Sequence, residues 1–277
     1  MEWSQCHGQK ISKYKMIILT GYKGFIGRNF FDNLLKEEVY RVEIDESFNF
    51  LEEYDKWDEV KLIIHMGACS STTERDLNKI HKYNVDFTIK LFEKAIEHGI
   101  PVKYASSASV YGNTVGRMNP LNYYAISKLQ IDYWVQDNID RFSKIQGYRF
   151  FNVYGKYEEN KIKVNQSSPV TKFINDIQKN GVIKLFEGSD DMIRDFVDVS
   201  DLVDIVLNKD LPSGIYDIGT GYPISFQEVA DLVVKKHGGT IEYTPFPDHL
   251  KGKYQYYTCA DVDYLDGYKF KNIDEFI

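Results

Sequence analysis

The first half of the chain alternates short apolar runs with longer stretches whose apolar residues recur at helical spacing. Apolar runs at residues 16–19, 62–66 and 102–105 are typical of buried strands, and residues 82–98 and 123–137 are typical of helices. Strands that alternate with helices build parallel sheets, so the pattern predicts an α/β fold with a doubly wound parallel sheet. Ligands of such sheets bind at the carboxyl ends of the strands.

Less regular patterns predict the remaining elements. A further strand is expected at 39–44, ending in Asp45, and a reduced strand at 48–51. After Gly155 the rhythm changes, which indicates a smaller lobe. The expected elements there are helices at 169–179, 201–207 and 226–236 and a strand at 183–186.

Composition narrows the functional class. The 34 Lys and Arg against 41 Asp and Glu give a net charge of −7, so a polyanionic nucleic acid is an unfavourable partner. No apolar run approaches the roughly 20 residues of a membrane span, and the N-terminus lacks the apolar core of a signal peptide. The three cysteines have neither disulfide-framework nor metal-ligand spacing, so we expect a cytoplasmic protein without a metal site.

A glycine turn follows the first predicted strand. Gly21, Gly24 and Gly27 form a Gly-x-x-Gly-x-x-Gly turn that opens a helix, whose N-terminus attracts phosphate. Alone, this could be an ordinary turn, but Asp45 follows where a carboxylate takes the ribose hydroxyls of a dinucleotide. The acidic pair Asp45–Glu46 would repel a 2′-phosphate, and no basic residue follows before Lys56. The residues therefore favour NAD over NADP.

Chemistry is indicated by Ser107, Tyr124 and Lys128. Residues four apart share a helix face, so Lys128 is expected beside the Tyr124 phenol, lowering its pKa from about 10. Tyr124 is then a candidate acid or base, and Lys128 is also expected to hold the nicotinamide ribose. Ser107, at a strand end in the same crevice, is expected to donate to a carbonyl or alkoxide. A surface Tyr–Lys pair and a serine turn are the alternatives.

These motifs occur in the order of the extended short-chain dehydrogenases. Within that class the chain resembles the ADP-L-glycero-D-manno-heptose 6-epimerase family, over nearly all residues after Lys15. The resembling segments include Gly-Ala-Cys-Ser-Ser-Thr-Thr-Glu at 67–74, Leu-Phe-Glu-Gly-Ser at 185–189, Arg-Asp-Phe-Val at 194–197 and Pro-Phe-Pro-Asp at 245–248.

The resemblance implies an enzyme that inverts C6″ of ADP-D-glycero-D-manno-heptose, a lipopolysaccharide heptose precursor. It does so by transient oxidation and re-reduction with tightly bound NADP or NAD, in a homo-oligomer. The implied division is a loose extension (1–14), a Rossmann domain (15–155, with 196–220 returning to it) and a substrate lobe (156–195 and 221–277).

The resemblance also assigns residue roles. Tyr124 and Lys161 are the two acid/base groups, assisted by Ser107. The implied cofactor contacts, together with the three turn glycines, are Phe25, Ile26, Asp45, Glu46, Gly67, Ala68, Cys69, Ser70, Asn84, Lys128 and Val153. The implied substrate contacts are Asn152, Lys172, Phe186, Glu187, Gly188, Ser189, Arg194 and Tyr254. A solvated Lys161, and an ion pair of Arg194 with a neighbouring Asp191 or Asp195, are the alternatives.

Two other functions stay open. A 4-epimerase or 4,6-dehydratase would use the same scaffold, although a dehydratase needs an acidic pair where Ala108 and Ser109 follow Ser107. A non-catalytic dinucleotide-binding protein could dispense with Tyr124 and Lys128. The family's small-residue run after Lys161 and the basic residue expected for NADP are both missing.

Overall fold

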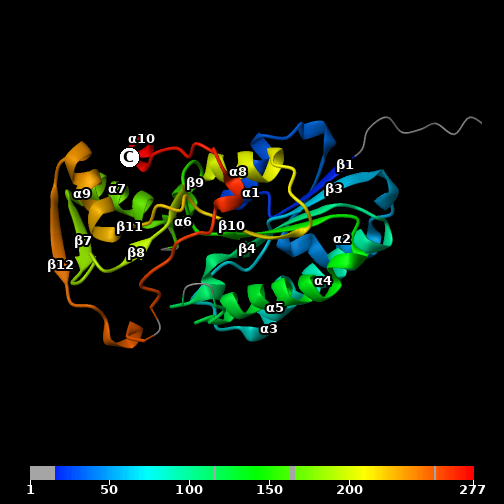
Figure 1. Cartoon of the computed structure of the whole chain (residues 1–277), viewed down its shortest axis with the longest axis horizontal. Helices are drawn as coiled ribbons and strands as arrows, with labels where there is room; N and C mark the ends of the chain where they lie inside the picture. Colours follow the sequence, from blue (N-terminus) through cyan, green and yellow to red (C-terminus); the bar gives the residue numbers. More distant parts are fainter. Residues whose placement is uncertain (1–15, 115–116, 163–165, 253) are drawn as a thin grey trace, which may run out of the picture.

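A six-stranded, fully parallel sheet forms the body of the protein, in the order β10-β5-β4-β3-β1-β2 (Figure 1). The structure is a computed structural model that describes residues 16–114, 117–162, 166–252 and 254–277. The strands are β1 (Met16–Thr20), β2 (Val39–Val42), β3 (Val60–His65), β4 (Val102–Ser107), β5 (Ile145–Phe150) and β10 (Gly214–Ile218). The predicted doubly wound parallel sheet is confirmed.

Helices cover both faces of this sheet because its strands are apolar on both sides. In β1, Ile18 belongs to one buried cluster, whereas Ile17 and Leu19 belong to the other. One face carries α1 (Phe25–Asp32) and α8 (Val199–Asn208); the other carries α2 (Ser47–Glu53), α4 (Phe87–Glu97) and α5 (Tyr123–Asn138) (Figure 1). None of the described helices is long and apolar enough to cross a membrane.

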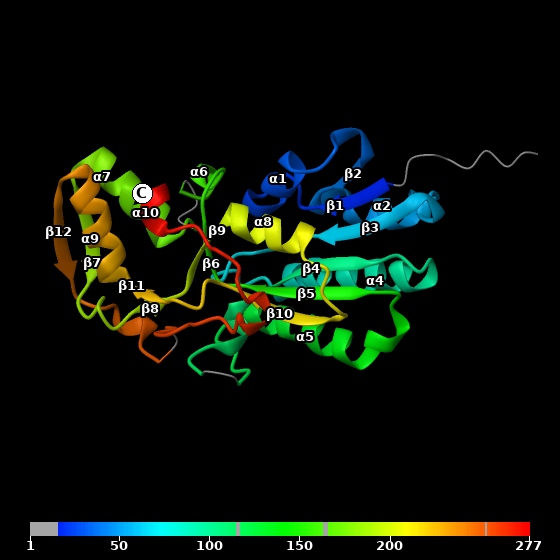
Figure 2. The same ribbon diagram turned by 45° about the horizontal axis from the view of Figure 1, so that its top comes forward.

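A smaller lobe lies beyond the carboxyl ends of the strands (Figure 2). Helices α7 (Pro169–Asn180) and α9 (Phe226–His237) pack on the parallel pair β7 (Val182–Phe186) and β12 (Thr240–Thr244). Short pairs link the lobe to the sheet: β6 (Asn152–Tyr154) with β9 (Phe196–Asp198), and β8 (Ile193–Arg194) with β11 (Ile224–Ser225). The remaining short helices are α3 (Leu77–Ile80), α6 (Glu159–Ile162) and α10 (Ile273–Phe276). That this lobe binds substrate stays a prediction.

Three expected elements differ in the structure. The strand predicted at 48–51 is wrong, because these residues lie in α2 and bury Phe50 against the sheet as a helix does. The helix predicted at 82–98 begins earlier, as α3, and passes through a π-helix at His81–Asp86 before α4. The strand predicted to reach residue 44 ends at Val42. The predicted extension 1–14 lies outside the described residues.

Candidate active site

Glycines bring three segments of backbone together at the carboxyl end of β1. Gly21 has φ +69°, and a Cβ atom there would lie 2.6 Å from the Gly67 Cα atom. A Cβ atom on Gly27 would lie 2.0 Å from the Gly21 carbonyl oxygen, so α1 packs directly on the turn. The N-terminus of α1, at Gly24, has no side-chain cap. The close approach and the open helix end fit a bound pyrophosphate.

The carboxylate at the end of β2 belongs to Glu43, which the sequence reasoning missed. The β1–β2 pairing ends at Val42, whose carbonyl accepts from Gly21 N at 2.8 Å. Glu43 Oε1 accepts from Lys23 N at 2.6 Å, and Glu43 lines a small cavity with Gly21, Gly67 and Ala68. The expectation that Asp45 ends the strand is therefore wrong.

Asp45 and Glu46 lie instead in the 3-10 turn that follows, Ile44–Glu46, and both are exposed. Glu46 lines a separate groove with Tyr40 and Tyr54, apart from the glycine turn. The strand ends early because β1, its only neighbour in the sheet, turns away at Gly21.

Buried polar side chains hold the loop that follows β3. Thr20 Oγ1 lies 2.7 Å from His65 Nδ1 and accepts from Gly67 N at 2.9 Å, while His65 Nε2 lies 2.9 Å from Thr88 Oγ1. Burial lowers the pKa of His65 to about 3, so the ring is neutral. These contacts fix the position of the Gly67 backbone relative to the end of β1.

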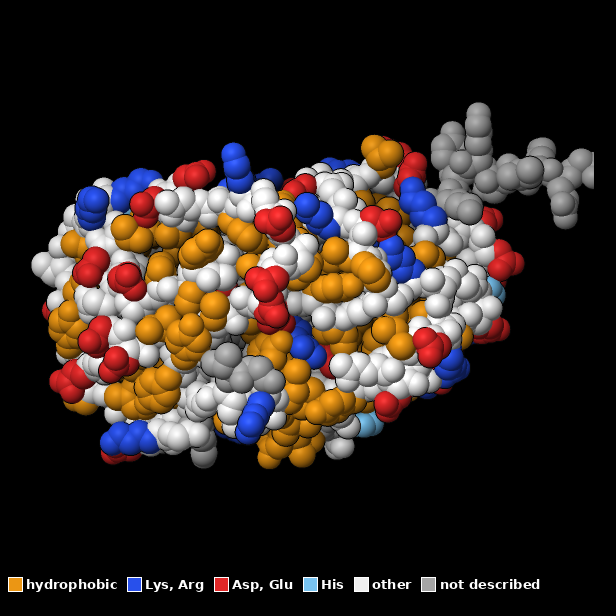
Figure 3. All heavy atoms as spheres, in the orientation of Figure 1, with side chains coloured by type: hydrophobic (Ala, Val, Ile, Leu, Met, Phe, Trp, Pro, Cys, Tyr) orange, Lys and Arg blue, Asp and Glu red, His pale blue; other side chains and the backbone are white. Residues whose placement is uncertain are grey.

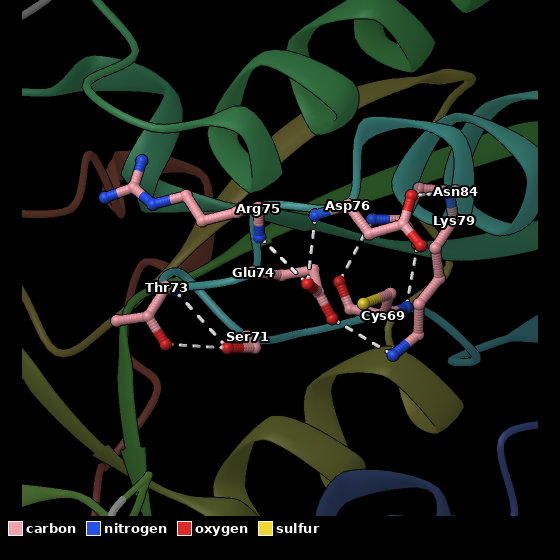
Figure 4. Close-up of polar contacts among 8 residues, drawn as sticks. All are labelled: Cys69, Ser71, Thr73, Glu74, Arg75, Asp76, Lys79 and Asn84. Carbon is pink, nitrogen blue, oxygen red and sulfur yellow. Dashed lines mark hydrogen bonds and ion pairs between the residues drawn. The ribbon is translucent and has the colours of Figure 1, made fainter.

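Asn84 fixes the same loop from the other side. Its side chain accepts from Cys69 N at 2.7 Å and donates to Cys69 O at 3.1 Å (Figure 4). It also donates to Ser127 Oγ at 3.0 Å. Farther along the loop, Glu74 accepts from Lys79 Nζ at 3.0 Å. The Asn84 amide is thus engaged with protein, and it fixes the backbone of Cys69. π-Helical turns such as the one carrying Asn84 are frequent at functional sites.

A cavity of about 280 Å³ opens where the carboxyl ends of β4 and β5 face α6 and α7. Its lining includes Ser107, Tyr124, Lys128, Asn152 and Lys161, so the residues predicted for catalysis come together. Among the predicted cofactor contacts, Phe25, Ile26, Ala68, Ser70, Lys128 and Val153 also line it.

Within this cavity the Ser107 side chain acts on the Tyr124 hydroxyl and lowers its pKa. Ser109, which the sequence reasoning did not assign, donates to Ser107 Oγ from its hydroxyl at 2.9 Å and its backbone N at 3.2 Å. Lys128 Nζ donates to the Ala105 carbonyl at 2.7 Å and lies 6.0 Å from the Tyr124 ring centroid.

The pKa of Tyr124 differs from the expectation. Burial raises it, and the nearby Ser107 side chain opposes this only in part. The prediction that Lys128 lowers this pKa is wrong, because the Lys128 ammonium is directed to the Ala105 carbonyl and burial lowers its own pKa to about 8. Tyr124 is therefore a protonated phenol at neutral pH, which suits it to donate a proton.

Lys161 lies on α6 and lines the same cavity as Tyr124 of α5. It is half-buried rather than solvated. Its Nζ lies 5.5 Å from the centroid of the Phe25 ring. Burial lowers the pKa of Lys161, and the charge of Glu158 opposes that shift. Glu158 itself is 2% exposed and lines the same cavity, although no local feature of the sequence indicates its burial.

A second cluster lies in the smaller lobe around Arg194. The guanidinium lies 5.4 Å from the ring centroids of both Phe226 and Tyr254, and it donates to the Ile193 carbonyl at 2.9 Å. The alternative of an ion pair with Asp195 is not formed. The Asp195 carboxylate accepts instead from the backbone N atoms of residues 220, 221 and 260 and from the hydroxyl of residue 220.

The other predicted substrate contacts of the smaller lobe lie in three places. Phe186 closes the aromatic cluster, with its ring 5.5 Å from Phe246, which lies 5.4 Å from Tyr254. Glu187 and Gly188 are exposed after the end of β7, and Ser189 is buried beside them. Lys172 pairs with Asp176 on α7 at 2.8 Å and does not line the described catalytic cavity.

Comparisons with known proteins agree with this geometry. The sequence profile of the NAD dependent epimerase/dehydratase family matches residues 17–219. The ADP-L-glycero-D-manno-heptose-6-epimerase of Alkalilimnicola ehrlichii is 38% identical over 90% of both chains. The crystal structure of the Helicobacter pylori enzyme of that name superposes with a TM-score of 0.79 at 25% identity, covering 95% of this chain and 94% of that one. A Thermus thermophilus UDP-glucose 4-epimerase solved with NAD gives 0.69 at 20% identity, covering 89% and 90%.

Proposed function

Because the chain belongs to the NAD-dependent epimerase/dehydratase family, we propose that it inverts C6″ of ADP-D-glycero-D-manno-heptose, giving the L-glycero form. The observation that carries the proposal is one cavity with two separate proton-transfer groups, Tyr124 and Lys161, on different elements. The 38% identity to the A. ehrlichii enzyme supports the heptose as substrate.

The reaction needs an acid/base group for each of two orientations of the sugar. A bound nicotinamide supplies the hydride acceptor and donor. Tyr124, with Ser107 beside it in the cavity, exchanges the C6″ hydroxyl proton in one orientation, and Lys161 does so in the other. Arg194, held between two rings, is suited to bind the diphosphate through its free guanidinium donors.

We test this by incubating the protein with ADP-D-glycero-D-manno-heptose and following the configuration at C6″ by NMR. Conversion to a mixture of the two epimers is expected with catalytic amounts of dinucleotide, because no net oxidation occurs. Light scattering on the same sample gives the subunit number. Conversion of UDP-glucose or UDP-N-acetylglucosamine, without conversion of the heptose, would instead support a 4-epimerase. Dinucleotide binding without turnover of any nucleotide sugar would support the binding-protein alternative.

The proposed cofactor is NAD, held by Glu43 rather than Asp45. The Glu43 carboxylate lines the cavity at the glycine turn, where it would accept the ribose hydroxyls and repel a 2′-phosphate. The family name and the NAD bound to the T. thermophilus enzyme support a nicotinamide cofactor. Gly21 and Gly24 carry no side chains that would cover the N-terminus of α1, where the pyrophosphate is expected to bind.

Replacing Glu43 with Gln should weaken NAD binding roughly tenfold, because one charged acceptor of the ribose hydroxyls is lost. It should also reduce the difference in affinity between NAD and NADP. Titration calorimetry with each dinucleotide measures both affinities. Asp45→Asn is the matched control and should leave them unchanged. If dinucleotide affinity changed in Asp45→Asn alone, Asp45 rather than Glu43 would be the residue that binds the ribose hydroxyls.

We further propose a cytoplasmic homo-oligomer. Leu77 of α3 and Tyr123, Ile126 and Tyr133 of α5 are exposed apolar side chains. Figure 3 shows hydrophobic side chains gathered in the part of the molecule where Figure 1 draws α3 and α5. This surface is suited to bury itself against a second copy.

A further inference from the structure

Glu158 is a buried carboxylate that the proposed mechanism does not use, because Tyr124 and Lys161 fill the two acid/base roles. It lies between β6 and α6, is 2% exposed, and lines the catalytic cavity. Among the described residues that line this cavity it is the only acid. Buried carboxylates are costly unless they are hydrogen-bonded or paired with a positive charge, so its partners indicate its purpose.

The Glu158 carboxylate binds the first turn of α7. It accepts from the backbone N of Ser168, from Ser168 Oγ at 2.9 Å and from Thr171 Oγ1 at 2.5 Å. Ser168 is the N-cap of this 12-residue helix, where the helix dipole favours a negative charge. These contacts join residues ten positions apart and hold Glu158, three positions before Lys161, against α7.

Backbone hydrogen bonds also connect Lys161 to its neighbours on both sides. Lys161 N donates to the Glu158 carbonyl at 2.9 Å, and Gln166 N donates to the Lys161 carbonyl at 2.9 Å. The Lys161 backbone is therefore hydrogen-bonded both to Glu158 and to Gln166, which lies two positions before the N-cap of α7.

Charge gives the pair a second connection. The titratable groups that line the cavity with Lys161 are the Tyr124 phenol and Lys128 ammonium of α5 and the Glu158 carboxylate, and the Lys161 ammonium lies near the Phe25 ring of α1. Only the carboxylate is an anion. Each charge opposes the effect of burial on the other: Glu158 raises the pKa of Lys161, and Lys161 lowers that of Glu158.

We propose that Glu158 is a positioning residue for Lys161: its carboxylate ties the Lys161 segment to α7 and supplies the counter-charge of the Lys161 ammonium. The inference rests on the proposed function for its catalytic meaning, since it assumes that Lys161 transfers a proton. The contact and the charge coupling can be measured without that assumption.

The direct test compares Glu158→Gln with Glu159→Gln, which removes the same charge from the exposed neighbouring position. Acetic anhydride is reacted with each protein across a pH series, and acetylation of Lys161 is read by mass spectrometry of its peptide. Loss of the counter-charge should lower the pKa of Lys161 by roughly one unit, so that acetylation near pH 7 is roughly tenfold faster. Glu159→Gln should follow the wild type.

Kinetics give the second readout. In Glu158→Gln we expect kcat to fall about tenfold while KM changes less than threefold, and the pH profile to shift in the direction of the Lys161 pKa. Glu158→Asp keeps the charge but is one methylene shorter, so it should restore the acetylation curve and leave kcat low. If Glu158→Gln does not fold, Thr171→Val removes one hydrogen bond to the Glu158 carboxylate. This variant should shift the acetylation curve in the same direction as expected for Glu158→Gln, but by less.

Identical acetylation curves for Glu158→Gln and wild type would overturn the inference. Coupling without any epimerisation by the wild type would instead overturn the proposed function and leave the positioning role intact. A shift of equal size in Glu159→Gln would show a general effect of net charge, which also contradicts the specific role of Glu158.

Discussion

The double variant Tyr124→Phe, Lys161→Met should bind dinucleotide and fold normally but show no measurable epimerisation. General acid–base catalysis contributes roughly 10²–10⁴-fold per group, and this variant removes the proton-transfer group for each orientation of the sugar. Phe fills the space of the phenol, and Met fills that of the lysine stem, so packing in the cavity is kept. The C6″ NMR assay, with dinucleotide titration and thermal unfolding alongside, measures all three properties.

The matched control is Tyr123→Phe with Lys156→Met. Both residues are exposed neighbours of the proposed catalytic pair along the chain, and the Lys156 ammonium contacts Asp32 and the Tyr157 ring on the surface. This control should retain nearly full turnover. Turnover by Tyr124→Phe, Lys161→Met within tenfold of the wild type would refute the assignment of both roles.

The largest loss of stability should follow from Asp132→Asn. The Asp132 carboxylate is fully buried on α5 and accepts from Arg149 Nε at 2.9 Å and Tyr104 OH at 3.1 Å. Removing one partner of a buried ion pair leaves the other charge uncompensated, which costs about 3–5 kcal/mol. Urea unfolding followed by circular dichroism measures the change in the free energy of unfolding.

The same substitution has an electrostatic effect on the cavity. The Asp132 charge raises the pKa of Lys128, which burial has lowered to about 8, so its removal should lower that pKa further. Lys128 would then lose its proton at a lower pH. Asp137→Asn, on the exposed side of the same helix, is the control. A loss below 1 kcal/mol for Asp132→Asn would show that Arg149 finds sufficient compensation in Tyr111, to which it also donates at 2.9 Å.

The sequence predicted the parts of the fold whose spacing is set by local geometry. Strands buried on both faces, such as β1, form apolar runs that need no tertiary information. The Tyr124–Lys128 spacing places both residues on α5 and in one cavity, as predicted from helix geometry. Only the electrostatic consequence was wrong, because burial and the Ala105 carbonyl are tertiary features.

The misses share a tertiary cause. The run at 48–51 has strand-like composition, and only its packing on the sheet makes it helical. Glu43 was missed because the end of β2 depends on where its neighbour β1 turns away. Glu158 stands in a polar, charged stretch, and its burial depends on Ser168 and Thr171, ten and thirteen positions further along.

The position of β10 has a consequence for how the chain folds during synthesis. Five strands of the sheet are complete once residue 150 has emerged, but β10, which pairs with β5, spans Gly214–Ile218. Until then β5 presents an open edge, the surface through which partly made sheets pair with other chains. The smaller lobe's first elements, including α6 and α7, must therefore emerge before the sheet can close. A nascent chain stalled between these points would be the species most prone to aggregate.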